Sequence, residues 1–103
     1  MQAKGKPGVK HDEGKVMGQL LGDFSRSLMA VAEVGTFGAK KYTRGGWQTV
    51  PNGEQRYHDA LYRHLLLSNQ EPCDSESGLG HLEHAAWNIL AVIELRRRNG
   101  SKT

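Results

Sequence analysis

Apolar residues recur at three- and four-residue steps along three segments of the chain, and this helical periodicity constrains the fold more than any other feature of the sequence. The pattern predicts helices at about 24–42, 53–69 and 79–98. With 103 residues, the chain has room for one domain with a modest core. We therefore expect an all-α fold, a small helical bundle of three main helices that is completed by oligomerisation.

The first eighteen residues differ from the rest of the chain. They carry glycines, a proline and alternating charges without periodicity, which is typical of an extended or mobile arm. The sequence therefore predicts a flexible N-terminal arm at 1–18 and a single helical domain at 19–103. Gly35 and Gly38 lie inside the first predicted helix, so either this helix breaks there or a close neighbour requires a bare backbone.

The overall composition limits the classes of partner. Lys and Arg outnumber Asp and Glu by 14 to 11, an excess smaller than that of a typical duplex-binding protein, so we expect an anionic small molecule rather than a duplex nucleic acid. Cys73 is the only cysteine, which rules out an intramolecular disulfide and fits a cytoplasmic protein. The longest apolar run, near 91–93, is too short to span a bilayer, so no membrane association is expected.

The last predicted helix carries a polar stripe of His81, His84 and Asn88. These residues either satisfy one another inside the core, because an unpaired buried polar group costs about 1–3 kcal/mol, or they line a cleft that receives a phosphate or a base. Two histidines at this spacing could also share a metal ion if another segment supplied a third ligand. Nearly opposite this stripe lies the expected core face, formed by Leu79, Leu82, Ala86, Ile89, Leu90 and Ile93.

The second predicted helix adds His64, which projects from the middle of its apolar face. Helices joined by a short connector are usually neighbours, so His64 is expected near the polar stripe of the last helix. Arg56, Asp59 and Arg63 share the adjoining face, where Asp59 could brace either arginine in a forked pair. The alternative is a solvated surface ion pair that stabilises the fold by less than about 1 kcal/mol.

Positive charge gathers where the first predicted helix ends. Lys40 and Lys41 close this helix, and Arg44 follows within the glycine-rich loop of residues 43–53. Part of this charge is simply favourable at a helix C-terminus. Trp47 in the same loop either fills the core or stacks on a base.

Three segments of the chain resemble a mainly phage-borne family of dATP/dGTP diphosphohydrolase-like proteins: FGAKKY (37–42), RYHDALYRHLL (56–66) and ESGLGHLEHAAWN (76–88). The resemblance covers about residues 10–95 and implies a helical fold that handles purine nucleotides. Members of this family commonly begin with a K-x-D-x-G-K pattern, which is present here as Lys10, Asp12, Gly14 and Lys15.

This family is related to MazG-like pyrophosphatases, which hold Mg²⁺ with four acidic residues in paired E-x-x-E and E-x-x-D helical motifs. The present sequence lacks such a pair of helical motifs, and histidines stand where carboxylates would be expected. Binding of a nucleotide without turnover therefore becomes plausible.

Two functional hypotheses follow. The first is a non-catalytic sponge, a homo-oligomer that needs no cofactor and sequesters a nucleotide immune signal such as a cyclic dinucleotide or an ADP-ribose derivative. Its Lys/Arg/His-lined pocket would also include Asp12, Trp47 and Asp59. In this hypothesis the phosphates pair with Lys10, Lys15, Lys40, Lys41, Arg56 and Arg63, and the base or ribose contacts His64, His81, His84 and Asn88.

The second hypothesis is a metal-dependent dATP/dGTP diphosphohydrolase that releases pyrophosphate. Asp12, Asp59 and Glu76 would come together from separate segments around Mg²⁺ or Mn²⁺. Asp59 and His84 would be the catalytic residues, with the histidine as the base.

Overall fold

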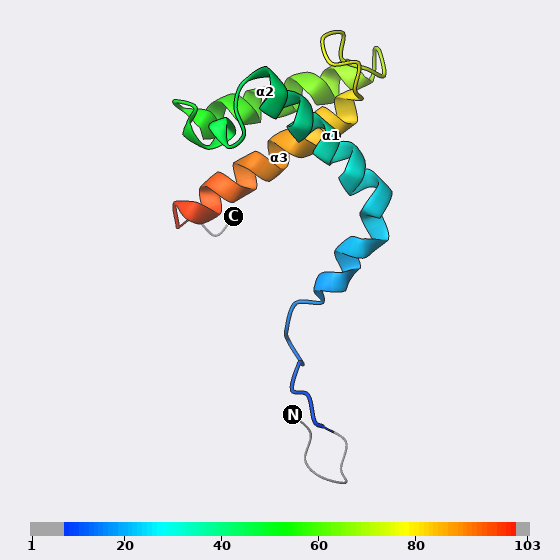
Figure 1. Cartoon of the computed structure of the whole chain (residues 1–103), viewed down its shortest axis with the longest axis vertical. Helices are drawn as coiled ribbons and strands as arrows, with labels where there is room; N and C mark the ends of the chain where they lie inside the picture. The colour runs from blue at the N-terminus through cyan, green and yellow to red at the C-terminus, as the bar shows by residue number, and fades with distance from the viewer. Residues whose placement is uncertain (1–7, 101–103) are drawn as a thin grey trace.

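The computed structural model describes residues 8–100 of the chain (Figure 1). Helices make up its regular structure, and the described residues contain no strand. The expected all-α fold with three main helices is confirmed, and the α-helices begin and end within two residues of the predicted positions. In chain order the elements are the 3-10 helix η1 (Gly18–Phe24), α1 (Ser25–Lys41), the 3-10 helix η2 (Gly46–Thr49), α2 (Gly53–Ser68) and α3 (His81–Arg98).

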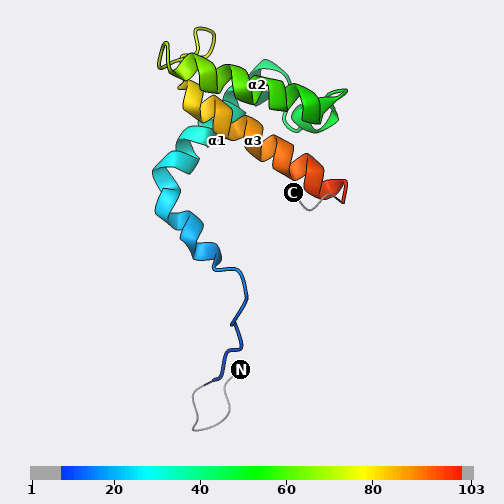
Figure 2. The same ribbon diagram turned by 180° about the vertical axis from the view of Figure 1, so that it is seen from behind.

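The helices form a hairpin with a third helix across it. α2 and α3 lie side by side and run in opposite directions, and the C-terminal half of α1 packs on α3 (Figures 1 and 2). The N-terminal half of α1 continues with η1 away from the hairpin, and residues 8–17 extend this direction without forming a helix (Figure 1). No helix in the described part of the chain is long and apolar enough to cross a membrane.

The core is small and lies where α1 crosses α3. Val31 and Val34 of α1 are buried there, as are small residues of α3. Gly35 allows the close approach, because a Cβ atom added to it would lie 2.5 Å from the Cζ3 atom of Trp87. The helix therefore does not break at Gly35, and a neighbour explains the glycine. No atom lies within 4 Å of the corresponding position at Gly38.

The face of α3 that was expected to form the core is largely exposed, so that expectation was wrong. Leu82, Leu90 and Ile93 are 60%, 48% and 43% exposed. Both neighbouring helices pack on the other side of α3, where small side chains permit close contact. The buried residues of α3 are His81, Ala85, Asn88, Ala91 and Val92.

The segment that projects from the hairpin is also rich in exposed apolar side chains. Leu20, Leu21 and Phe24 of η1 are more than half exposed, as is Met29 of α1. Residues 8–17 are exposed throughout. The division into a flexible arm at 1–18 and a domain at 19–103 stays a prediction, and its residues 1–7 and 101–103 lie outside the described range.

Candidate functional site

A groove of about 1070 Å³ lies between the C-terminal half of α1, the loop that contains η2, residues 56–63 of α2 and the middle of α3. Its polar lining is cationic, because the side chains of Lys40, Arg44, Arg56 and Arg63 all border it. Among the described residues that line the groove there is no Asp or Glu. The groove is therefore a region of positive potential with space for a small molecule.

Aromatic side chains also line the groove. Trp47 meets the rings of Tyr57 and Trp87 edge to face, with centroids 6.4 Å and 6.3 Å apart. The hydroxyl of Tyr57 donates a hydrogen bond of 2.6 Å to the backbone carbonyl of Trp47. Burial raises the pKa of Tyr57, so this hydroxyl stays a donor at neutral pH. These contacts fix the loop, and Trp47 both packs on aromatic neighbours and lines the groove.

The two groove arginines of α2 are not braced by Asp59 as the sequence suggested. Oδ1 of Asp59 instead accepts a hydrogen bond of 3.3 Å from Nε2 of Gln55, one turn earlier on the same helix. Arg56 and Arg63 are exposed, and neither forms an ion pair with any residue from 8 to 100. Their guanidinium groups therefore remain available for an external anion.

The two lysines at the end of α1 differ from each other. Lys40 lines the groove, whereas Lys41 forms an ion pair with Glu76 of the connector between α2 and α3. The hydrogen bond that Lys41 donates to the Glu76 carboxylate is the main reason why the pKa of Lys41 is raised. Lys41 and Glu76, which were predicted to bind phosphate and metal respectively, therefore neutralise each other.

The N-terminal residues of the predicted site lie apart from the groove within a single chain. Lys10, Asp12 and Lys15 are exposed and belong to the segment that extends away from the hairpin (Figures 1 and 2). Asp12 therefore does not meet Asp59 and Glu76 within one copy. The acidic set that was predicted to hold Mg²⁺ is not assembled there.

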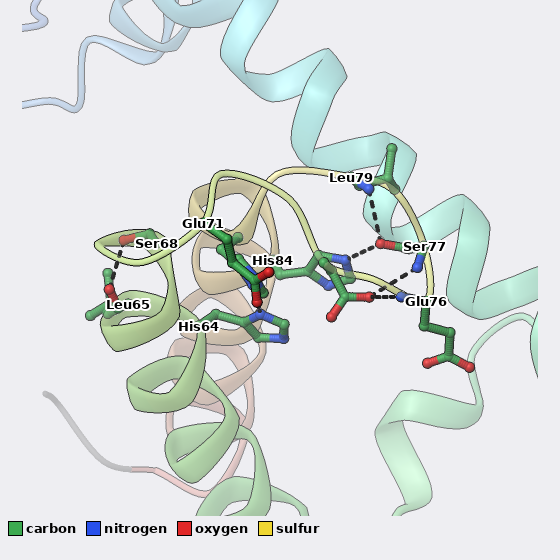
Figure 3. A network of polar contacts seen from close by, with 10 residues as sticks. His64, Leu65, Ser68, Glu71, Glu76, Ser77, Leu79 and His84 are labelled. Atoms are coloured by element: carbon green, nitrogen blue, oxygen red, sulfur yellow. Dashed lines mark hydrogen bonds and ion pairs between the residues drawn. The ribbon is translucent and has the colours of Figure 1, made fainter.

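The predicted histidines form a separate cluster at the other end of the α2–α3 hairpin (Figure 3). Nδ1 of His64 lies 2.9 Å from Nδ1 of His81, and the rings of His64 and His84 stack with centroids 4.5 Å apart. Nε2 of His84 lies 2.7 Å from the hydroxyl of Ser77. These side chains contact one another and do not line the groove. Asn88 joins the two regions, because it borders the groove and donates to the carbonyl of His84.

Asp74, in the connector before α3, completes this cluster. One oxygen of its carboxylate accepts hydrogen bonds from the backbone N–H groups of Glu76 and Ser77, at 3.1 Å and 2.9 Å. Asp74 was not among the site residues predicted from the sequence. An aspartate followed by serines and a glycine is typical of a turn in which the carboxylate accepts local backbone hydrogen bonds, and this signal could have identified it.

The electrostatics of the cluster favour neutral imidazoles beside an ionised carboxylate. Burial is the main cause that lowers the pKa of His64 and of His84, and neighbouring histidines lower both further. Burial by itself would raise the pKa of Asp74, but the hydrogen bonds from the connector and the nearby His84 outweigh it, and the pKa is lowered. At neutral pH the rings of His64 and His84 are therefore uncharged, and the carboxylate of Asp74 carries a negative charge.

Comparisons with known proteins agree with the sequence motifs. A family model described as dATP/dGTP diphosphohydrolase, N-terminal, matches residues 5–103. A curated relative from Salmonella phage PMBT28, named dATP/dGTP diphosphohydrolase, is 36% identical over 89 residues. That alignment covers 85% of the present chain but only 29% of the phage protein. No solved structure matches the chain significantly.

Proposed function

The chain belongs to the dATP/dGTP diphosphohydrolase N-terminal family, and from this premise we propose that it binds a phosphate-rich purine nucleotide in the cationic groove without hydrolysing it. In this proposal the protein is a sponge that acts in the cytoplasm of an infected host cell. It sequesters a nucleotide immune signal, either a cyclic dinucleotide or an ADP-ribose derivative. The observation that carries the proposal concerns residues 8–100: among them the groove has no carboxylate in its lining, and its cationic side chains have no ion-pair partners.

The phosphates of the ligand would meet the cationic side of the groove. Arg56 and Arg63 are two turns apart on α2, and a guanidinium can donate two parallel hydrogen bonds to a phosphate. Lys40 and Arg44 approach from α1 and from the loop. Side chains from three segments can therefore surround a ligand with more than one phosphate.

The base would meet the aromatic side. Trp47 and Trp87 border the groove, and Tyr42 does so as well while remaining 69% exposed. Stacking of a base on an aromatic ring contributes about 1–3 kcal/mol and tolerates different bases. Asn88, at the junction with the histidine cluster, presents the amide that can contact a base edge or a ribose.

The positions of the acidic residues argue against hydrolysis by this chain alone. Attack on a diphosphate normally uses Mg²⁺ held by carboxylate oxygens, and Asp12, Asp59 and Glu76 lie in separate places in one copy. The chain covers only 29% of the phage relative, so the activity in that protein's name need not reside in the shared segment.

The alternative function is a metal-dependent dATP/dGTP diphosphohydrolase, which the family membership favours. It requires Asp12 from one copy to approach Asp59 and Glu76 of another around Mg²⁺ or Mn²⁺, with His84 as the base. Glu76 would then have to leave Lys41.

A homo-oligomer is part of both proposals. Apolar side chains are exposed in η1, in the first half of α1 and on the outer face of α3, and a second copy that covered them would supply the core that one chain lacks. We expect light scattering to give a mass above that of one chain. Replacement of Phe24 and Leu28, both exposed, by serine should lower that mass, whereas a monomeric parent protein would overturn the expectation.

A ligand panel tests the proposed function. Thermal unfolding of the untagged chain is measured with cyclic dinucleotides, ADP-ribose derivatives, dATP and dGTP, each with and without Mg²⁺ or Mn²⁺. A ligand at a hundred times its dissociation constant adds about 2.7 kcal/mol of stability. Mass spectrometry of each mixture should then recover the stabilising nucleotide intact. Release of pyrophosphate from dATP or dGTP would overturn the sponge proposal in favour of the diphosphohydrolase.

A further inference from the structure

The histidine cluster holds three potential metal ligands that come from different segments. His64 of α2, Asp74 of the connector and His81 of α3 each bring one ligand atom to within 4.8 Å of the other two. His64 and Asp74 are ten positions apart in the sequence, and Asp74 and His81 are seven positions apart, so only the fold brings them together. Figure 3 shows the imidazole rings of His64 and His84 on the inner side of the connector.

The contact between His64 and His81 is incomplete without a proton or a cation. Their Nδ1 atoms are 2.9 Å apart, which is a hydrogen-bond distance when one of them carries a proton. When neither carries one, two lone pairs face each other and repel. A metal ion uses both lone pairs at once, and it requires imidazoles in the neutral form.

The second observation concerns the other nitrogen of His81. This side chain is 1% exposed, and among the described residues its Nε2 atom has no hydrogen-bond partner. Oε1 of Glu71 lies 3.5 Å from this atom. A histidine that binds a metal through one nitrogen usually donates its other N–H to a carboxylate, which fixes the tautomer and the ring. Glu71 is placed to accept this proton after a shift of a few tenths of an ångström.

We propose that His64, Asp74 and His81 bind a divalent transition-metal ion of the Zn²⁺ type, with the facing Nδ1 atoms and the Asp74 carboxylate as ligands. Glu71 orients His81 from outside the ligand set. The proposal is independent of the cationic groove, and it concerns a different ion from the Mg²⁺ or Mn²⁺ of the alternative hydrolase.

The donor types decide which ions fit this site. Imidazole nitrogens suit Zn²⁺ and its transition-metal neighbours, whereas Mg²⁺ prefers oxygen ligands in an octahedral arrangement. Two imidazoles and one carboxylate leave a fourth position of a tetrahedral ion for water. Such an ion would join α2, the connector and α3, the elements whose packing positions the groove.

Metal binding by the untagged full-length chain tests the proposal. After dialysis against EDTA, the chain is titrated with Zn²⁺ by calorimetry and with Co²⁺ as a probe of visible absorption. We expect one ion per chain, visible bands of a four- or five-coordinate Co²⁺ site, and no displacement by millimolar Mg²⁺. His64→Gln and Asp74→Asn should each weaken Zn²⁺ binding by at least about tenfold, because loss of a group that only hydrogen-bonds to a metal ligand already costs that much.

The control is His58→Gln, which changes a histidine on the same helix that meets the ring of Tyr62 edge to face and lies outside the cluster. It should bind Zn²⁺ as the parent chain does. Asp74→Asn keeps an oxygen for the backbone N–H groups of Glu76 and Ser77, so it remains a fair test if His64→Gln unfolds. Weak binding of several ions per chain, or binding unchanged by Asp74→Asn, would overturn the proposal.

Discussion

The cationic groove and the histidine cluster use the same two helices but leave their polar groups in opposite states. Arg63 and His64 are consecutive residues of α2, yet Arg63 borders the groove without an ion-pair partner in the described chain, while His64 contacts His81 and His84. A helix turns by about 100° per residue, so neighbours in sequence face different surroundings. The groove therefore has charge available for a ligand, whereas the histidines of the cluster contact one another and Ser77.

The largest expected effect is a loss of nucleotide binding when the groove is changed. Replacement of both Arg56 and Arg63 by alanine should weaken binding of the nucleotide identified in the ligand panel by about 10²–10⁴-fold, because each charged hydrogen-bonding group contributes about 1.5–3 kcal/mol. Calorimetry measures the dissociation constants. Arg97→Ala, at the exposed end of α3, is the matched control and should leave affinity unchanged. Equal losses for Arg97→Ala and the double variant would show that the groove is not the binding site.

The next largest effect concerns the contribution of the cluster to the stability of the folded chain. His81→Ala removes a fully buried side chain and leaves Nδ1 of His64 without its partner, so the free energy of unfolding should fall by about 2–4 kcal/mol. Chemical denaturation of the metal-free chain measures this loss, and His58→Ala is the control. A loss no greater than that of the control would mean that the cluster contributes little to the fold.

The helices of the two regions could be predicted from the sequence, but their packing could not. Helical periodicity is a local property, so it was sufficient to predict the positions of the three α-helices. The buried face of α3 was predicted wrongly because it depends on which neighbours pack against it, and Gly35 and Ala85 favour the histidine side over Leu82 and Leu90. The histidines were correctly grouped from their spacing, since a short connector places α2 beside α3.

The charged partners were harder to predict than the helices. Asp59 was expected to brace an arginine, but its carboxylate instead accepts a hydrogen bond from Gln55, one turn away on the same helix. Lys41 finds Glu76, which is distant in sequence and comes close only through the fold. Asp74 was missed for the same reason, because its proximity to His64 and His81 arises from the path of the connector.

The pH dependence of stability should come from the cluster and not from the groove. The pKa values of His64 and His84 lie below the ordinary 6.5 in the folded chain, mainly because burial disfavours the imidazolium form. The unfolded chain therefore binds protons more readily in this range. The stabilisation is fully present above about pH 6.5 and is lost as the pH falls toward the folded pKa values.

Denaturation in EDTA-containing buffers between pH 7.5 and pH 5 measures this slope. His84→Gln should flatten it, because one of the two histidines with a lowered pKa is gone. His11→Gln changes an exposed histidine in the N-terminal segment and should leave the slope as it is. A chain whose stability did not fall over this interval would contradict the described burial of the imidazoles.

The smallest effect compares two adjacent lysines that differ only in their partners. Lys40 lines the groove and has no ion-pair partner in the part of the chain that the structure describes, whereas Lys41 is paired with Glu76. Lys40→Met should therefore weaken nucleotide binding by about tenfold, the effect of one charged hydrogen-bonding group. Lys41→Met should change nucleotide binding and thermal stability little, because its ion pair is exposed to solvent and screened. If Lys41→Met weakened binding more than Lys40→Met, the ion pair would have to open when the ligand binds, and the phosphate contacts would extend from the groove toward the connector.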